Sequence, residues 1–331
     1  MLKVANLSIK DKEALFRNTA QKYGMNEAIV EKDFWVCWVM NYLFQYSKWK
    51  NHFAFKGGTS LSKSYGLIER FSEDIDLILD WRLLSYSLDE PWNERSKTKQ
   101  DLFNKGANLK TAAFLKDEFI PCLNSDFSTL LDEPFSLYID EVDPQTVNFA
   151  YPQLFQDSAI LKVIRMEIGA LAAWTPTQNI MITSYAAEKY PHVFHQAATN
   201  VLTVAAERTF WEKITILHKE AFRTNGIFPE RYSRHYYDLY CMNYSTVKSN
   251  AFSNLELLEL VTTFKARFYP ANSARYDLAK PGTMKLMPPK VCLSALESDY
   301  AHMQNMIYGH SPKFSEIMDS IRVLESEINN L

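Results

Sequence analysis

The sequence predicts an α+β fold, and three observations support the prediction. Several short apolar runs with strand character lie in the first 200 of the 331 residues. Apolar residues spaced three and four apart predict two helices before the first of these runs. From about residue 202 onward, the same spacing predicts an almost wholly helical half. Strands flanked by helices are typical of an α/β or an α+β domain, and we expect α+β. The strand-like runs are 52–56, 75–80, 135–150, 159–169 and 180–183.

Two helices are expected at the start of the chain, at 8–23 and 26–46. Ser8 is a candidate N-cap for the first of them. The second is apolar around most of its circumference, which predicts a central position. Its charged cluster, Glu31-Lys32-Asp33, is expected to form an exposed stripe with local ion pairs, because charged clusters on helices usually face solvent. Cys37 in the same helix is expected to be a buried free thiol.

Composition is ordinary for a globular protein, with 47% hydrophobic and 23% charged residues. A net charge of −3 gives no global attraction to nucleic acid, so such a partner needs a local basic patch. The four cysteines lie far apart and form no Cys-x-x-Cys pair, which excludes the usual zinc spacing. No signal-peptide region and no run of about 20 apolar residues occurs, so we expect a cytoplasmic protein without a membrane partner.

The strongest functional signal joins a glycine turn to two carboxylates. Gly57-Gly58-Thr59 follows the first strand-like run, and Asp74-x-Asp76 begins the second. Alternate strand residues share a face, so both aspartates are expected to point the same way. Two adjacent carboxylates suit Mg²⁺, and glycines let a backbone approach a phosphate closely. This order of motifs predicts a metal-dependent site for a nucleoside triphosphate (NTP).

A third acid is expected near this pair. Glu167 is the one acid in the apolar run from Val163 to Gly169. If Met166 and Ile168 face one side, Glu167 and Arg165 face the other. Glu167 is therefore either a metal ligand or base, or an edge-strand acid paired with Arg165.

Two segments of the helical half carry further candidates. Lys213 follows two large aromatic residues, so its stem can be buried while its ammonium reaches inward, toward triphosphate oxygens. The alternative is a solvated lysine paired with Glu212 or Glu220. Arg234 and Asp238 are four apart on one helix and can line a site or simply form an ion pair. His235 is interpreted as structural, and Tyr236 and Tyr237 as core residues more readily than as base-stacking ones.

Taken together, these features predict a catalytic domain at 1–200, which includes the N-terminal helical hairpin, and a helical domain at 201–331. The second is expected to pack on the first and to complete a cleft, where ligand sites commonly lie.

At this point the residues resemble a known family, the AbiEii/AbiGii toxin nucleotidyltransferases of the polymerase-β-like superfamily. The similarity extends over most of the chain. The matching stretches are Glu31-Lys32-Asp33-Phe34, Lys56-Gly57-Gly58-Thr59-Ser60-Leu61, Arg70-Phe71-Ser72-Glu73-Asp74-Ile75-Asp76-Leu77, 207–213 and Arg234-His235-Tyr236-Tyr237-Asp238-Leu239, with Asp299-Tyr300, Met303 and Met306 in the tail.

The resemblance implies a polymerase-β-like core with a mixed sheet, and transfer of a nucleoside monophosphate (NMP) from an NTP with release of pyrophosphate. It implies Mg²⁺, with Mn²⁺ as a substitute, at Asp74 and Asp76. Lys213 and Asp238 match later motifs of the family, which supports both as site residues. The resemblance also implies an RNA acceptor such as tRNA and a cognate antitoxin. The phosphate contacts that it implies come from Lys56, Gly57, Gly58, Thr59, Arg70 and Ser72, and Arg234 is expected beside them. One departure is that more residues separate Thr59 from Asp74 than in typical polymerase-β-like enzymes.

Two other functions remain open at this stage. One is a nucleotide-binding regulatory module without turnover. The other is a nucleic-acid-binding protein without chemistry, suggested by the lysines of the segment 97–116, which equally suit a solvated helix face.

Overall fold

The structure is a computed structural model, which describes residues 1–157, 160–224 and 229–331. It divides the chain into two compact units. Unit 1 contains residues 1–64 and 72–204, and unit 2 contains residues 65–71 and 205–331. The segment 65–71 therefore belongs to unit 2, although it lies in the sequence between the glycine turn and the aspartate pair. This segment makes up part of the spacing between Thr59 and Asp74.

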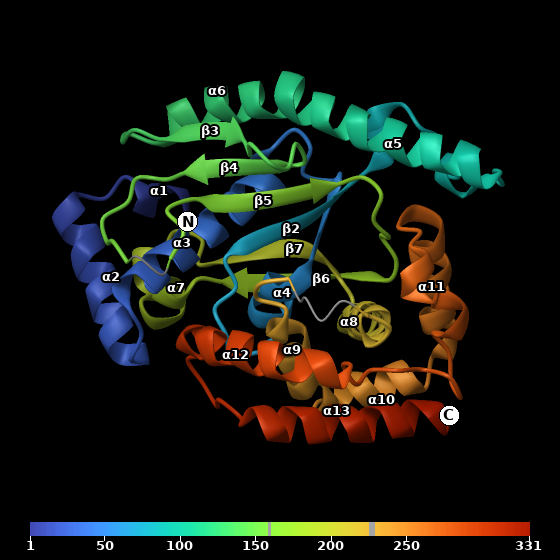
Figure 1. The fold of residues 1–331 in the computed structure, drawn as a ribbon. Helices are drawn as coiled ribbons and strands as arrows, with labels where there is room; N and C mark the ends of the chain where they lie inside the picture. Colours follow the sequence, from blue (N-terminus) through green and yellow to red (C-terminus); the bar gives the residue numbers. More distant parts are fainter. Residues whose placement is uncertain (158–159, 225–228) are drawn as a thin grey trace. The chain divides into compact units, whose positions relative to one another are not determined.

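Unit 1 is built on a mixed sheet of seven strands in the order β3-β4-β5-β2-β1-β7-β6 (Figure 1). Strand β2 lies near the middle, antiparallel to β1 and parallel to β5. A mixed sheet combined with many helices confirms the α+β prediction. The strands are β1 (Phe53–Lys56), β2 (Asp74–Leu79), β3 (Ser136–Ile139), β4 (Thr146–Ala150), β5 (Ile164–Gly169), β6 (Thr177–Thr183) and β7 (Ala198–Val204).

Most expected strands are present, with three differences. The run 135–150 forms two antiparallel strands, β3 and β4, and Pro144, which indicates a break in the sequence, lies between them. The run 159–169 is a strand only from Ile164, and residue 159 lies outside the described residues. The sequence does not predict strand β7, because its apolar residues continue into the next helix without a turn residue between them, and this pattern predicts helix for 202–204. It pairs with β1 in parallel and with β6 antiparallel, and it thereby joins β6 to the sheet.

The helices of unit 1 include the two expected at the N-terminus. Ser8 caps α2, as predicted, by accepting a hydrogen bond from the backbone N–H of Asp11 at 3.1 Å. Helix α3 continues as a π-helical turn, 42–46. The helices are α1 (Leu2–Ala5), α2 (Ile9–Tyr23), α3 (Glu27–Asn41), α4 (Gly57–Lys63), α5 (Lys97–Phe114), α6 (Ile120–Leu130) and α7 (Tyr185–Lys189), with a further π turn at Leu115–Phe119 and 3-10 turns at Trp81–Leu84, Glu90–Trp92 and Pro191–Val193.

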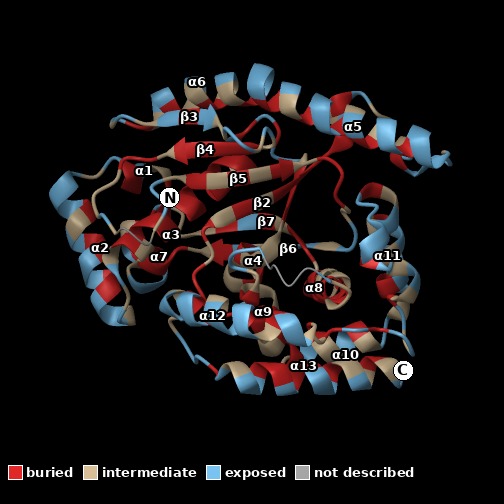
Figure 2. Ribbon diagram, in the orientation of Figure 1, coloured by how far each residue is buried: buried red, intermediate tan, exposed pale blue. Residues whose placement is uncertain are grey.

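Helix α3 is the central helix of unit 1. Trp35 and Trp38 pack on Phe149 of β4, with ring centroids 5.9 and 6.0 Å apart, and Cys37 is a fully buried free thiol, as expected. Every residue from Val30 to Asn41 is buried. Figure 2 shows the contrast with α5 and α6, which each keep an exposed face.

The prediction for the charged cluster of α3 is wrong. Glu31, Lys32 and Asp33 are 0%, 0% and 2% exposed. A helix that is apolar all round leaves no solvent-facing side, so its charged residues must find partners inside the protein.

Unit 2 is helical, as predicted for this half of the chain. Strand-like contact is limited, among its described residues, to the bridge between Arg70 and Ile307. None of the helices described in either unit is both long and apolar enough to cross a membrane. The helices of unit 2 are α8 (Ala206–Ala221), α9 (Ser233–Asn243), α10 (Thr246–Phe252), α11 (Leu255–Phe268), α12 (Leu293–Met303) and α13 (Phe314–Asn329), with 3-10 turns at Asn272–Ala274, Tyr276–Leu278, Lys290–Cys292 and Gln304–Met306.

Candidate active site

The aspartate pair lies on one face of β2. Ile75 and Leu77 are buried on the opposite face, whereas Asp74 and Asp76 are partly exposed. This alternation is the arrangement that the sequence predicted. Two carboxylates therefore project side by side from a central strand of the sheet.

Gly57 lies directly against one of these carboxylates. It begins α4, immediately after β1, and has a φ of +81°. A Cβ atom at this position would lie 1.9 Å from Oδ2 of Asp76. Only glycine combines this backbone conformation with this approach. The glycine turn and the aspartate pair, separate in sequence, thus form one continuous surface in unit 1.

Side chains of the turn also connect it to β2. The Thr59 hydroxyl donates a hydrogen bond to the backbone carbonyl of Asp74 and lies 3.0 Å from the Ser72 hydroxyl. Thr59 is 1% exposed. Lys56 directly precedes the turn, at the end of β1. It lies opposite Asp76 in the antiparallel pairing of β1 and β2.

Glu167 lies on the same face as the aspartates. In the parallel pairing of β2 and β5, Asp76 lies opposite Glu167, and Asp74 lies opposite Arg165. Met166 and Ile168 are buried on the other face, as predicted. Strand β5 lies between β4 and β2, so Glu167 is not an edge-strand acid.

Arg165 lies among these acids. Its guanidinium is 3.7 Å from Asp74, 3.8 Å from Glu167 and 2.9 Å from Asp140. As these side chains stand, no group of three His, Cys, Asp or Glu residues in the described part of the chain is close enough to hold a metal ion. The donor set nevertheless suits a hard divalent cation, because Asp74 and Asp76 present carboxylate oxygens from one strand face and Glu167 adds a third from the next strand.

Helix α3 holds both parts of this surface through its buried charges. The Lys32 ammonium is 2.6 Å from the carboxylate of Glu73, the residue before Asp74, and 2.8 Å from the carbonyl of Leu161. Asp33 forms an ion pair with Lys63, at the end of α4. One helix therefore fixes the start of β2 and the helix that carries Gly57.

This supporting role of α3 was not predicted from the sequence. The signal was present, since a charged cluster in a helix without a polar face has to be paired internally. The neighbouring Glu31 carboxylate is also used, accepting hydrogen bonds from the backbone N–H groups of Leu154 and Phe155 at 2.7 and 2.9 Å.

Unit 2 contains a second cluster of candidate residues, centred on Asp238. The Arg70 guanidinium donates two hydrogen bonds to the Asp238 carboxylate, at 2.7 and 2.8 Å, and the Lys213 ammonium lies 2.7 Å from the same group. Asp238 is fully buried, and Arg70 and Lys213 are about 5% exposed. The alternative of a solvated Lys213 is therefore wrong, and Glu212 and Glu220 pair instead with Arg208 and Arg223.

The charges of this cluster depend on one another. Burial alone would raise the pKa of Asp238, but Arg70 and Lys213 outweigh it and hold that pKa well below its usual range. Burial lowers the pKa of Lys213, an effect that Asp238 opposes. Burial and the charges of Lys213 and Arg234 lower the pKa of His235 well below its ordinary value.

The remaining candidates of α9 behave differently from one another. Arg234 is partly exposed, and within the described chain it makes no ion pair with Asp238, which is bound by Arg70 and Lys213. Tyr236 and Tyr237 are each 1% exposed, which confirms their interpretation as core residues.

Comparison with known proteins assigns the family. Residues 38–320 match the profile of the AbiEii family, the nucleotidyl transferase AbiEii toxin of type IV toxin–antitoxin systems. The chain belongs to this family. The AbiEii match covers most of the sequence and confirms the resemblance found from the motifs. The protein is therefore a nucleotidyltransferase toxin. This implies a nucleotide as its substrate and an antitoxin as its partner. Nucleotidyltransferases of this kind generally use a divalent metal.

Two solved structures are similar over nearly their full length. MenT4, a nucleotidyltransferase toxin from Mycobacterium tuberculosis H37Rv, is 16% identical, with a TM-score of 0.48 over 94% of this chain and 99% of MenT4. A candidate nucleotidyltransferase from H. pylori is 13% identical, with a TM-score of 0.40 over 92% of this chain and 98% of its own. No curated protein matches the AbiEii-family chain by sequence.

Proposed function

We propose that this AbiEii-family enzyme transfers an NMP from an NTP to an RNA acceptor, with Mg²⁺ bound at Asp74 and Asp76. The observation that carries the proposal is the contact between Gly57 and the Asp76 carboxylate on a strand face that also holds Asp74. A carboxylate pair beside a glycine turn suits a metal-bound triphosphate, because the acids would hold a divalent metal that neutralises phosphate charge.

Bound Mg²⁺ would neutralise charge on the triphosphate and orient it for in-line displacement. Asp74 and Asp76 would hold the metal through their carboxylate oxygens. Glu167 is proposed as the third acid, which either completes the metal site or accepts the proton of the attacking hydroxyl. Its place opposite Asp76 on the adjacent parallel strand supports this role.

The turn 57–59 is proposed to hold the phosphates that leave as pyrophosphate. Gly57 and Gly58 add no side chain between the backbone and the anion. Thr59 and Ser72 fix the turn to β2 through their hydroxyls, and Lys56 brings a positive charge to the same face of β1.

In unit 2, Lys213 is proposed as a cation that binds phosphate oxygens. Lys213 is held in one position by Asp238, so its ammonium is ordered before any ligand binds. Arg70 shares that carboxylate, which gives it a positioning role beside its predicted phosphate contact. Arg234 is proposed as a phosphate or RNA contact, because its guanidinium is partly exposed and Asp238 is occupied by other cations.

The acceptor is proposed to be RNA, with tRNA as the first candidate, and the site of action to be the cytoplasm. The AbiEii family supports this proposal, because its members are toxins of type IV toxin–antitoxin systems. The proposal extends the family assignment, which identifies the enzyme class and leaves the acceptor open.

The test is transfer of label from each of the four α-³²P-labelled NTPs to total tRNA, with Mg²⁺, Mn²⁺ or EDTA. We expect label on RNA with at least one nucleotide, loss of label with EDTA, and loss with Asp76→Asn. The exposed acid Glu141 provides the matched control, and Glu141→Gln should transfer normally. If no nucleotide labels RNA while a transferase of known activity works in the same buffer, the proposed acceptor is wrong.

A further inference from the structure

A cavity of about 310 Å³ in unit 1 takes no part in the site described above. It lies where β2 and β5 end, and three tryptophans contribute to its wall. This volume is at the lower end of the range for small-molecule sites. Its lining consists of Asp80, Trp81, Arg82, Leu88, Asp89, Trp92, Ala173, Trp174 and Thr175.

The cavity is aligned with the aspartate pair along one strand. Asp80 directly follows β2, so it is four residues beyond Asp76, or about 13 Å along an extended strand. Ile78 continues the face that carries Asp74 and Asp76, and it is buried with Ala54, Ala172 and Val204 against Trp174. A wall of the cavity thus borders the same face of the sheet as the carboxylates.

The lining suits a flat aromatic ligand with polar edges. Trp92 is 40% exposed and Trp174 is partly exposed, so both present ring surface. Trp81 is 7% exposed, and its buried Nε1 has no hydrogen-bond partner among the described residues. The polar part of the lining includes Asp89 and the ion pair of Arg82 with Asp80, in which the Arg82 guanidinium lies 2.6 Å from the Asp80 carboxylate. Tryptophan faces with a few polar groups are the surfaces on which unpaired nucleobases stack.

The direction of the reaction favours the acceptor as the source of that base. The glycine turn joins β2 at Asp74, through the hydrogen bond from Thr59, whereas the cavity lies at the other end of β2. If the turn holds the leaving pyrophosphate, in-line displacement requires the attacking group to approach from the opposite side of the reacting phosphorus. An acceptor that approached along β2 from the end distant from this hydrogen bond would pass the cavity.

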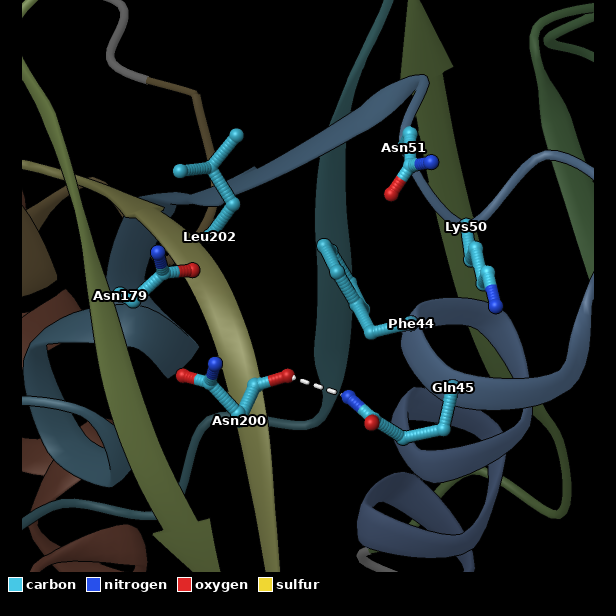
Figure 3. A pocket seen from close by; sticks show the side chains of 7 residues that line it. All are labelled: Phe44, Gln45, Lys50, Asn51, Asn179, Asn200 and Leu202. Carbon is cyan, nitrogen blue, oxygen red and sulfur yellow. Dashed lines mark hydrogen bonds between the residues drawn. The ribbon is translucent and has the colours of Figure 1, made fainter.

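A second cavity of unit 1, of about 420 Å³, has a different character (Figure 3). Side-chain amides surround it, and Gln45 donates a hydrogen bond to the backbone carbonyl of Asn200. Phe44 is the one aromatic ring of its lining and is 7% exposed, so this cavity offers little surface for stacking. Its lining is Phe44, Gln45, Lys50, Asn51, Asn179, Asn200 and Leu202.

We propose that the tryptophan-lined cavity binds one unpaired nucleobase of the RNA acceptor, by stacking on Trp92 and Trp174. The inference rests on the proposed function, because it assumes that the acceptor is RNA. It adds a substrate subsite that is separate from the metal and phosphate contacts.

The test measures binding of a fluorescein-labelled, unstructured RNA octamer to the full-length protein by anisotropy, without NTP. Trp92→Ala should weaken binding roughly 5- to 140-fold, the range for loss of one stacked base, and Trp92→Phe should restore most of it. Tyr138 is the matched control, since it is 44% exposed on β3, and Tyr138→Ala should bind like the wild type.

Octamers with a single abasic position locate the base. One position should weaken binding to the wild type and have no further effect on Trp92→Ala, because both changes remove the same contact. Equal binding by wild type and Trp92→Ala would overturn the proposal. If Trp92→Ala raises the KM for NTP but leaves RNA binding unchanged, the proposal is also overturned, because the cavity then binds the incoming nucleotide. If the wild type transfers no NMP, one abasic position can still weaken its RNA binding and leave that of Trp92→Ala unchanged. In that case the proposed function fails and the base subsite stands.

Discussion

The α-carbon of Gly57 lies against the carboxylate of Asp76, so that a Cβ at Gly57 would be 1.9 Å from Oδ2 and 3.0 Å from Cβ of Asp76. An aspartate side chain is short, and it can relieve such a clash only by rotating its carboxylate away. The first residue of the glycine turn therefore determines where one of the two carboxylates that we propose as metal ligands points.

Gly57→Ala is expected to reduce NMP transfer far more than it reduces stability. The positive φ should cost about 1–2 kcal/mol in the free energy of unfolding. Displacement of the Asp76 carboxylate by about 1 Å should lower kcat/KM on the order of 100-fold. Urea denaturation and a transfer assay on the same preparation measure the two effects.

Gly24→Ala is the matched control for this change. Gly24 also has a positive φ, of +65°, and apart from its chain neighbours no atom of the described residues lies within 4 Å of the place that a Cβ at Gly24 would occupy. It should show the same loss of stability with normal transfer. Equal losses of transfer in both variants would refute a specific role for the Gly57 contact.

Glu167→Gln is expected to abolish most transfer while leaving the fold intact. The side chain is 42% exposed, so the amide should fit without loss of core packing. If Glu167 binds metal, Mn²⁺ affinity in a calorimetric titration should fall together with transfer. If it acts as a base, Mn²⁺ binding should stay near the wild-type value while kcat falls. Normal transfer by the variant would remove Glu167 from the site.

Asp33→Asn is expected to destabilise unit 1 by about 3–5 kcal/mol, because it leaves the buried Lys63 ammonium without its one carboxylate partner among the described residues. The double variant Asp33→Leu/Lys63→Met should recover much of that loss, since it removes both charges. The exposed pair of Lys105 and Asp101 provides the control, and Asp101→Asn should change stability by less than about 1 kcal/mol. Chemical denaturation of the three variants decides the matter, and similar losses for Asp33→Asn and Asp101→Asn would contradict a structural role for α3.

The parts of this protein that the sequence predicted are those governed by local rules. Asp74 and Asp76 alternate with buried residues, and Glu167 alternates with Met166 and Ile168, because strand periodicity alone determines which face each occupies. The Ser8 cap follows equally from its place just before an apolar helical repeat.

The parts that were missed depend on residues far apart in the chain. Arg70 and Asp238 are 168 positions apart, and no local pattern shows that they share a bidentate contact. The general rule for charged helix residues failed at Asp33 for the same reason, since its partner Lys63 lies on another helix. Tertiary pairing overrode local expectation at each of these buried charges.

Glu31 gives the enzyme a predicted pH dependence of stability. Burial raises the pKa of Glu31 from 4.5 to about 7, against the hydrogen bonds from Phe155 and Leu154 that lower it. In this range the folded state binds the proton more tightly than the unfolded state does. The stability that protonation of Glu31 contributes is therefore fully present below about pH 4.5 and is lost as the pH rises through about 7.

The expected size of that change is about 3 kcal/mol, at about 1.4 kcal/mol per pKa unit. Glu31→Gln replaces the carboxyl by a neutral group of the same shape, so its stability should lack this component. Between pH 5 and pH 8 the wild type should lose up to about 3 kcal/mol of its free energy of unfolding relative to Glu31→Gln. Urea denaturation at unit pH intervals measures it, and Glu141→Gln should follow the wild-type curve. A constant difference between wild type and Glu31→Gln over this range would show that Glu31 does not titrate there, and that its two backbone hydrogen bonds outweigh its burial.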